Sequence, residues 1–361
     1  LARQTQAMHT FFTSGATLDY EFRVTALDKL AACLKRREAQ LAAALKADLG
    51  KAPGETYLTE VGPVLNEITF LRRRLRALMR PRLARTSLAL FPACSRIYPE
   101  PLGLCLVMAP WNYPVQLGFM PMVGAVAAGN CVVLKPSSRA PATAVLMAEL
   151  VAECFAPEHV HATWDASAAK GEALLKERWD FIFYAGSARV GREVMAAAAR
   201  HLTPVCLELG GKCPAVVAED ANVELAARRI AWGKLLNAGQ TCVAPDYVLA
   251  AAGIKNRLAA ALRAEFARFP GQGGAALGNS EYARIVSSEV MARLQKLSDG
   301  AAVCDYTSLR MAPLVMDEVG PEHPVMNEEI FGPLLPILGV ADMNAAAEFV
   351  RAREKPLACY I

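Results

Sequence analysis

The feature that most constrains the fold is an alternation of apolar strand-like and helix-like segments that begins at Leu102. Strand-like segments at residues 102–108, 131–134 and 180–184 alternate with helix-like segments at 115–128, 142–154 and 190–199. Parallel strands need a long crossover connection, which is usually a helix. The alternation therefore predicts an α/β fold that contains a parallel sheet.

A second set of such segments begins near Val205. We expect strands at 205–209, 215–217, 246–250 and 334–340, with helices at 223–236, 255–268, 283–297 and 343–353. Ahead of the first set, helical spacing of apolar residues is seen in 18–49, a second helix is expected at about 55–79, and the Pro-marked passage 81–101 is too irregular for a helix. Because 361 residues are many for one core, two domains are expected.

One stretch, residues 101–134, carries no charged residue and is long enough to cross a bilayer. Pro110, Pro114 and Pro121 interrupt it, so we interpret it as buried strand, loop, helix and strand rather than as a membrane span. A basic stretch at 71–85 is either a solvated helix face or a patch that meets anionic lipid or a partner.

Composition excludes several classes of protein. Hydrophobic residues make up 54% and charged residues 20%, which excludes a disordered chain, and a net charge of +4 gives no reason to expect nucleic acid as the main partner. The ten cysteines include no C-x-x-C pair and the histidines form no metal-ligand set, so we expect a reduced protein without a metal site. The first residues contain no long apolar stretch typical of a secretory signal, and we expect a cytoplasmic location.

Two segments of the first set have features of a cofactor site. The turn at 184–191, with Gly186, Ser187 and Gly191, joins a strand to a helix, where backbone N–H groups and the positive helix end can approach a phosphate. Lys135 ends a strand at the carboxyl edge of the sheet, where doubly wound folds bind ligands. The alternatives are an ordinary strand-to-helix turn and a solvated surface lysine.

Four further segments carry residues suited to catalysis or to ligand binding. Cys242, in the loop NAGQTC, lies among small residues, and a thiolate near backbone N–H groups is an activated nucleophile. Glu208 ends an apolar strand before two glycines, where burial would raise its pKa and suit a general base. Asn112, in PWNYP, could donate to an oxyanion, and Glu328, Glu329 and Phe331 precede a strand. The alternatives are a buried apolar cysteine, an ion-paired carboxylate, a turn-stabilising asparagine and a charged loop with one core anchor.

Together and in this order, these motifs resemble the aldehyde dehydrogenase superfamily from about Leu18 to the last residue. The most specific parts are APWNYP, LKPS, GSxxVG, LELGGK, NAGQTCVAPDY, VMNEEIFGP and REKPLA. TPVCLELGGK, RRIAWGK and CVAPDYVL are similar to the class 3 branch, whose members oxidise fatty and aromatic aldehydes. The resemblance implies a Rossmann-like cofactor domain at 1–81 and 103–208, a β extension for dimerisation at 82–102, and an α/β catalytic domain at 209–361.

The resemblance also implies roles for individual residues. Cys242 matches the nucleophile, Glu208 the base that activates the deacylating water, and Asn112 the oxyanion amide. Lys135 matches the lysine that meets the cofactor ribose. The turn of Gly186, Ser187 and Gly191 matches the cofactor turn, and Glu329 and Phe331 match the residues that hold the nicotinamide ribose and ring. The implied reaction is the NAD(P)-dependent oxidation of an aldehyde to a carboxylic acid by a homodimer.

Two departures from the family pattern shape these expectations. The family's Glu after Lys-Pro-Ser is Ser138 here, followed by Arg139, so we expect NADP to be used as well as NAD. The chain stops at Ile361, where the family continues, so it is expected to be C-terminally truncated. The alternatives are an impaired family member with a binding or structural role and a thioester-forming acyl-CoA-type dehydrogenase, which Glu208 argues against.

Overall fold

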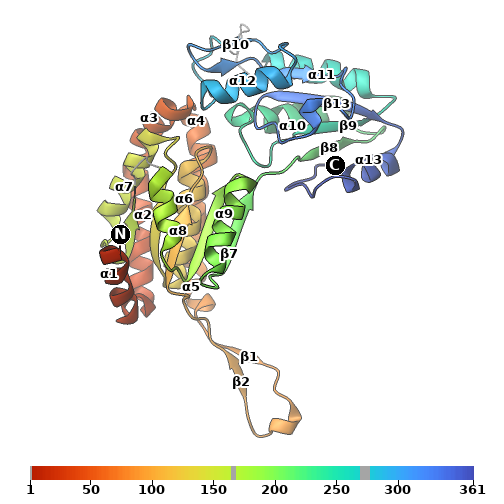
Figure 1. Ribbon diagram of the computed structural model, residues 1–361. Coiled ribbons are helices and arrows are strands. Elements are labelled where there is room, and N and C mark those ends of the chain that lie inside the picture. Colours follow the sequence, from red (N-terminus) through yellow and green to blue (C-terminus); the bar gives the residue numbers. More distant parts are fainter. Residues whose placement is uncertain (1, 164–167, 269–276) are drawn as a thin grey trace. The chain divides into compact units, whose positions relative to one another are not determined.

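The computed structural model describes residues 2–163, 168–268 and 277–361. The chain divides into two compact units, one formed by Leu1–Ala44 and Thr56–Glu208 and the other by Leu45–Glu55 and Leu209–Ile361 (Figure 1). Each unit contains its own sheet, so the expected α/β fold with parallel sheets is confirmed.

The first unit is built on a five-stranded sheet. Its order is β5 (Val160–Ala162), β4 (Cys131–Lys135), β3 (Leu104–Met108), β6 (Phe181–Gly186) and β7 (Val205–Leu209). The central strand β3 pairs in parallel with both β4 and β6, which aligns Met108 with Lys135 and with Tyr184. The register therefore places the ends of three strands side by side, directly before the loops that carry candidate residues. Since β7 lies in this sheet, the assignment of 205–209 to the second set of strands was wrong.

Helices flank this sheet: α6 (Pro114–Ala128), α7 (Pro141–Cys154), α8 (Ala168–Lys176) and α9 (Ala188–Ala199). The uncharged stretch is strand β3, a loop and α6, as expected. Helix α6 begins with Pro114, whose fixed φ suits a first helical turn, and ends at Gly129 in the left-handed region with φ 91°. Among the helices of the described ranges, none is both long enough and apolar enough to cross a membrane.

The N-terminal part of the chain is helical. It comprises α1 (Ala2–Thr13), which the sequence analysis did not anticipate, η1 (Ala16–Leu18), α2 (Tyr20–Arg36), α3 (Glu38–Leu49), α4 (Pro53–Thr56), η2 (Tyr57–Val61) and α5 (Gly62–Leu78). The single helix expected at 55–79 is interrupted by η2, which is a π-helical turn closed by a hydrogen bond from Gly62 N to Tyr57 O. A Cβ at Gly62 would lie 2.8 Å from that oxygen, so glycine allows the wide turn to form.

The Pro-marked passage forms an antiparallel hairpin that extends away from the helices of the first unit (Figure 1). Its strands are β1 (Arg82–Ala84) and β2 (Ser95–Ile97), and its tip contains η3 (Leu88–Leu90). Large apolar side chains on it are exposed, including Leu88 at 90% and Phe91 at 83%. Large apolar side chains that are exposed together usually mark a surface that a partner covers.

The second unit is built on a four-stranded sheet with the order β12 (Leu314–Met316), β13 (Leu334–Val340), β9 (Tyr247–Ala251) and β8 (Pro214–Val217). All its pairs are parallel, and Tyr360 adds a parallel bridge to Ala215. The alternating side chains of β9 enter two apolar clusters, Leu249 on one face and Val248 on the other. Both faces of the sheet are therefore covered, as expected for parallel strands.

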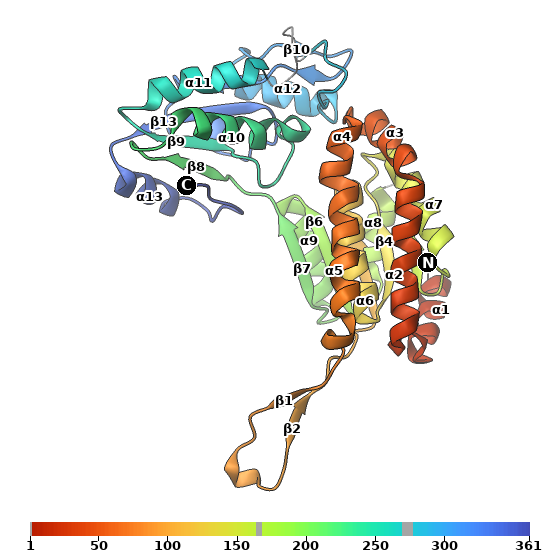
Figure 2. The same cartoon turned by 180° about the vertical axis from the view of Figure 1, so that it is seen from behind.

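Helices α10 (Val223–Leu235) and α11 (Lys255–Arg268) lie together on one face of this sheet (Figure 2). Helix α12 (Ser288–Leu297) packs on the other face, and α13 (Met343–Arg351) follows β13. The remaining elements are η4 (Leu236–Gly239), β10 (Cys304–Asp305), β11 (Arg310–Met311) and η5 (Pro324–Met326). The helix expected at 283–297 begins later, because the Ser287 side chain caps α12 by accepting from Val290 N.

Candidate active site

The candidate residues fall into two groups, one in each unit. The first unit holds the residues of the β3, β4, β6 and β7 ends: Asn112, Lys135, Ser138, Gly186, Ser187, Gly191 and Glu208. The second unit holds Cys242, Glu329 and Phe331.

Asn112 is buried in the loop between β3 and α6, with 4% of its surface exposed. The helix that follows is held by a residue from a distant part of the sequence. The fully buried Glu60 accepts hydrogen bonds at Oε2 from Val115 N and Gln116 N, both 3.0 Å long. These N–H groups lie in the first turn of α6 and have no partner within the helix, so Glu60 fixes the helix start just after Asn112.

Lys135 ends β4 and is partly buried, and this burial lowers the pKa of its ammonium group. Its Nζ donates to Pro136 O over 3.5 Å. Ser138 and Arg139 follow in a loop and both are exposed. The charged Arg139, which follows the position where the family pattern has a glutamate, is thus exposed shortly after the end of β4.

The turn after β6 is organised by Tyr184 and Ser187. The Tyr184 hydroxyl donates to Ser187 O over 3.4 Å, and a Cβ at Gly186 would lie 2.2 Å from this hydroxyl. The Ser187 side chain caps α9 by accepting from Val190 N, and Gly191 is buried in the first turn. The turn therefore has a closely packed glycine directly before the start of a helix, where backbone N–H groups can approach a phosphate.

Glu208 lies near the end of β7 and is exposed. The burial expected for this carboxylate from its place at the end of an apolar strand was wrong. An apolar pocket within the first unit therefore does not prepare Glu208 to act as a base. In that role, the basicity of its carboxylate would depend on the water and the substrate around it.

The loop before Cys242 has an unusual backbone. Asn237 and Ala238 both have φ 52° and Gly239 has φ 76°, so consecutive residues are left-handed. The buried Gln240 side chain holds this loop: Nε2 donates to Asn237 O and to Arg284 O, and Oε1 accepts from Val286 N, each over 2.9 Å. Left-handed non-glycine residues persist only where the surroundings fix them, and they are frequent at functional sites.

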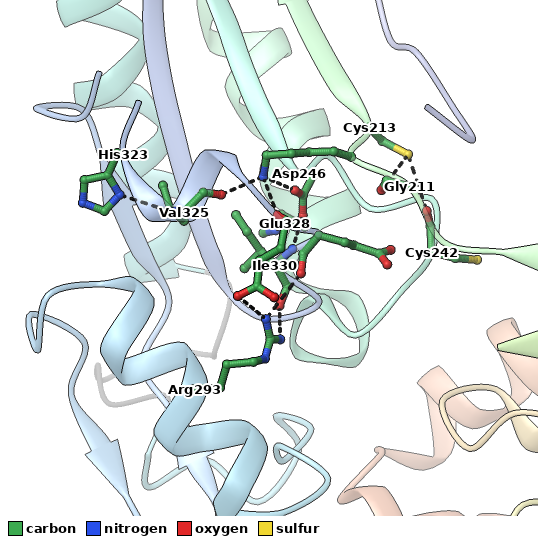
Figure 3. Close-up of polar contacts among 12 residues, drawn as sticks. Gly211, Cys213, Cys242, Asp246, Arg293, His323, Val325, Glu328 and Ile330 are labelled. Atoms are coloured by element: carbon green, nitrogen blue, oxygen red, sulfur yellow. Dashed lines mark hydrogen bonds and ion pairs between the residues drawn. The ribbon is translucent and has the colours of Figure 1, made fainter. Parts of the chain in front are cut away.

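Cys242 is partly buried at the end of this loop. The Cys213 thiol donates to Cys242 O over 3.4 Å, as Figure 3 shows. Burial raises the pKa of the Cys242 thiol, the negative charge of Glu329 raises it further, and the backbone N–H groups of Cys242 and Val243 lower it. The expected effect of the backbone N–H groups on this pKa is present, but burial raises the pKa more than they lower it.

Glu329 is the carboxylate of the second unit whose pKa changes most. Burial and the charge of Asp246 raise the pKa of Glu329 to about 7, against the hydrogen bond from the Gly211 backbone and the charges of Lys234 and Lys212. Its buried Oε1 accepts no hydrogen bond within the described part of the chain.

Both glycines of LELGGK are required by close contacts. A Cβ at Gly210 would lie 2.0 Å from Glu329 Oε2, and one at Gly211 would lie 2.9 Å from Leu357 N. Phe331, two residues after Glu329, has φ 50° and is partly buried. The segment that carries Glu329 therefore packs directly on the glycine pair.

Charged residues join three of the motifs into one network (Figure 3). Lys212 Nζ lies 2.5 Å from Asp246 Oδ2 and also donates to the backbone oxygens of Val325 and Glu328. Asp246 Oδ1 accepts from Ile330 N over 3.1 Å. Two further cations lie nearby: the fully buried Lys234, with Nζ 3.8 Å from Asp246 Oδ1, and Arg293, which donates to Glu329 O and Ile330 O.

Glu60, Lys212, Lys234, Asp246 and Arg293 are functional candidates that the sequence did not suggest. Lys212, Lys234 and Asp246 stand inside the quoted motifs LELGGK, RRIAWGK and CVAPDY, so their position in these motifs was the available signal. Glu60 and Arg293 lie on helical stretches where charged residues normally face solvent, and no quoted motif contains them.

Comparison with known proteins gives a consistent result. The sequence profile described as "Aldehyde dehydrogenase family" matches residues 2–361. "Aldehyde dehydrogenase family 3 member H1" of Arabidopsis thaliana is 42% identical over 360 residues, which cover 97% of this chain and 74% of the relative. "Aldehyde dehydrogenase, dimeric NADP-preferring" of Rattus norvegicus is 40% identical over 355 residues, with 97% and 78% covered.

Solved structures agree with these relatives. The substrate-bound AldH of Staphylococcus aureus superposes with a TM-score of 0.95 at 37% identity, covering 99% of this chain and 79% of that one. Betaine aldehyde dehydrogenase of the same organism, in complex with NAD+, gives a TM-score of 0.85 at 25% identity, with 96% and 72% covered.

Proposed function

Because the chain belongs to the aldehyde dehydrogenase family, we propose that it oxidises medium- or long-chain aliphatic or aromatic aldehydes to carboxylic acids with NAD or NADP. The substrate class is the one that the resemblance to the class 3 branch implies, and the similarity to family 3 proteins supports that resemblance. The structural observation that supports the chemistry best is Cys242, which follows a left-handed loop held by Gln240.

In the proposed reaction, the Cys242 thiolate forms a C–S bond to the aldehyde carbon, and the carbonyl oxygen becomes an oxyanion. The Asn112 amide and the Cys242 backbone N–H donate to this oxyanion. A bound NAD or NADP would supply the acceptor for the hydride of the same carbon, which leaves a thioester on Cys242. Glu208 takes a proton from water, the resulting hydroxide attacks the thioester carbon, and the C–S bond breaks to release the carboxylic acid and restore the Cys242 thiolate.

The residues present suit a nicotinamide cofactor. The buried Glu329 Oε1 is an acceptor without a donor in the described residues, as a ribose hydroxyl would need. The first turn of α9 begins directly after Gly186 and Ser187 and can offer backbone N–H groups to a phosphate, and Lys135 is partly buried at the end of β4. We propose that Lys135 and Glu329 hold ribose hydroxyls, that the turn at Gly186, Ser187 and Gly191 holds phosphate, and that Phe331 contacts the nicotinamide.

We propose that both cofactors are used, because Ser138 provides no carboxylate to repel a 2′-phosphate and the exposed Arg139 adds positive charge. Ser138→Glu should lower kcat/KM for NADP by about tenfold, which corresponds to about 1.4 kcal/mol, and leave NAD nearly unchanged. A strong preference of the parent for NAD that Ser138→Glu does not alter would contradict this assignment.

The test of the reaction is absorbance of NAD(P)H formed with a medium-chain or aromatic aldehyde. Cys242→Ala should abolish the signal, while Cys206→Ala, which removes a partly buried thiol on β7, should not. Cys206 is a better control than Cys213, whose thiol contacts the Cys242 backbone. Activity that survives in Cys242→Ala contradicts the proposed nucleophile.

The role of Glu208 is tested by rapid mixing. Glu208→Gln should release one reduced cofactor per active site in a burst and then turn over slowly, because hydrolysis of the thioester is impaired. A steady-state rate equal to that of the parent would exclude Glu208 as the base.

We also propose that the hairpin of β1 and β2 mediates homodimerisation, because its exposed apolar residues need a covering partner. Sedimentation of the parent should give the mass of a dimer. The double substitution Leu88→Asp and Phe91→Asp should give a monomer with an unchanged far-ultraviolet spectrum, and a dimer that persists would exclude the hairpin.

A further inference from the structure

The segment that carries Glu329 has little secondary structure of its own. It begins in the short η5, and residues 327–333 form neither helix nor strand. Side chains from other parts of the second unit therefore determine where this segment lies.

Lys212 and Asp246 make the principal contacts. The Lys212 ammonium group has three protons and three acceptors, namely Asp246 Oδ2 at 2.5 Å, Val325 O at 2.8 Å and Glu328 O at 3.0 Å. All its donors are used, so its position is fully determined. Asp246 is 3% exposed, and its other oxygen accepts from Ile330 N.

These bonds bracket Glu329 on both sides. Lys212 binds the carbonyl of the residue before it, and Asp246 binds the N–H of the residue after it. Figure 3 shows Asp246, Glu328 and Ile330 close together, with Arg293 on the far side of the segment. The backbone at Glu329 is consequently fixed at two adjacent peptide groups.

We propose that Asp246 is a positioning residue that, together with Lys212, holds residues 325–330 so that Glu329 is aimed at the bound cofactor. The proposal rests on the proposed function for its readout, although the contacts that carry it do not. Asp246 contacts Lys212, Lys234 and Ile330 N and acts through the segment, so its loss should weaken cofactor binding more than it slows the chemical step.

The variant that tests this is Asp246→Asn, with Asp342→Asn as the matched control. Asp342 is an exposed residue outside residues 325–330 that caps α13 by accepting from Ala345 N. Asp246→Asn should raise the KM for NADP at least about tenfold and change kcat less than about threefold, and Asp342→Asn should change neither. The rate at which iodoacetamide alkylates Cys242 should stay within about threefold of the parent's in both.

Asp246→Asn leaves the buried Lys234 without its counter-ion and could unfold the chain. The double variant Asp246→Asn/Lys234→Met removes one buried charge of each sign and still loses the Lys212–Asp246 ion pair. It should fold and show the same rise in KM. A double variant whose KM for NADP equals that of the parent overturns the proposal. An equal fall of kcat and of the alkylation rate, in the single or in the double variant, overturns it too.

Hydrogen exchange of the unmodified protein gives a test that needs neither variant nor activity. The Ile330 amide should be protected as strongly as amides of β13, although it lies outside any helix or strand. Exchange at the rate of an open loop overturns the proposal. If the parent fails to oxidise aldehydes, the proposed function is refuted, while the exchange result still decides whether the segment is held.

Discussion

His159 should make the stability of the chain depend on pH between 4 and 6.5, and the structure gives the size of the effect. The residue precedes β5 and is 3% exposed. Its ring lies between aromatic rings, with centroids 4.9 Å from Phe22, 5.7 Å from Phe155 and 6.0 Å from Phe11. Burial lowers the pKa of His159 from 6.5 to about 4, against a hydrogen bond with the Asn130 backbone.

The sign follows from where the proton binds. Below pH 6.5 the unfolded chain takes up a proton on His159 that the folded chain does not, so the free energy of unfolding falls as pH falls. The loss ends near pH 4, where the folded chain binds the proton too. The full difference corresponds to about 3 kcal/mol, of which about 2 kcal/mol is lost by pH 5.

Urea unfolding followed by tryptophan fluorescence at pH 7.5 and pH 5 measures this difference. His159→Leu removes the titrating ring, so its stability should fall by about 2 kcal/mol less than that of the parent over the same interval. His201→Gln, which removes an exposed histidine of the same unit, should follow the parent. Equal losses in the parent and in His159→Leu would refute the reasoning, whatever the absolute stabilities.

Three further substitutions test the site. Glu60→Gln weakens the hold on the start of α6 behind Asn112, so kcat/KM for the aldehyde should fall about tenfold, as steady-state kinetics will show. Gly210→Ala places a Cβ 2.0 Å from Glu329 Oε2, so the KM for the cofactor should rise at least about tenfold. The control Gly320→Ala, whose Cβ meets nothing within 4 Å, should leave this KM unchanged. Glu329→Gln removes a negative charge that raises the pKa of Cys242, so the pH midpoint of alkylation by iodoacetamide should move to lower pH; an unchanged midpoint would contradict this effect of the charge.

The strands and the main helices could be predicted because periodicity and prolines act locally. Residues 102–134 are an example: their apolar pattern predicts strand, loop, helix and strand, and the structure contains β3, α6 and β4. The start of α12 was predicted too early, because the apolar pattern does not show that the helix begins only after its Ser287 cap. The sheet to which β7 belongs depends on pairing between strands, which periodicity does not report.

Only those residues of the site that stand in recognisable sequence motifs could be predicted. Cys242 and Glu329 stand in motifs that resemble a known family, whereas Glu60 acts on backbone N–H groups of a helix far along the sequence. The exposure of Glu208 and the raised pKa of Cys242 depend on packing around each side chain, so no local pattern could indicate them. The left-handed φ of Asn237 and Ala238 likewise follows from the hydrogen bonds of Gln240.

The packing of the Cys242 loop has a consequence for the newly synthesised chain. A Cβ at Gly239 would lie 2.3 Å from Gly332 O, so the loop is seated directly on a segment that the ribosome makes much later. Until residues near Gly332 have emerged and folded, the loop lacks the surface that supports its left-handed backbone. The loop of Cys242, the proposed nucleophile, is therefore completed late, and a partly made chain carries this thiol without the left-handed backbone that precedes it in the folded protein.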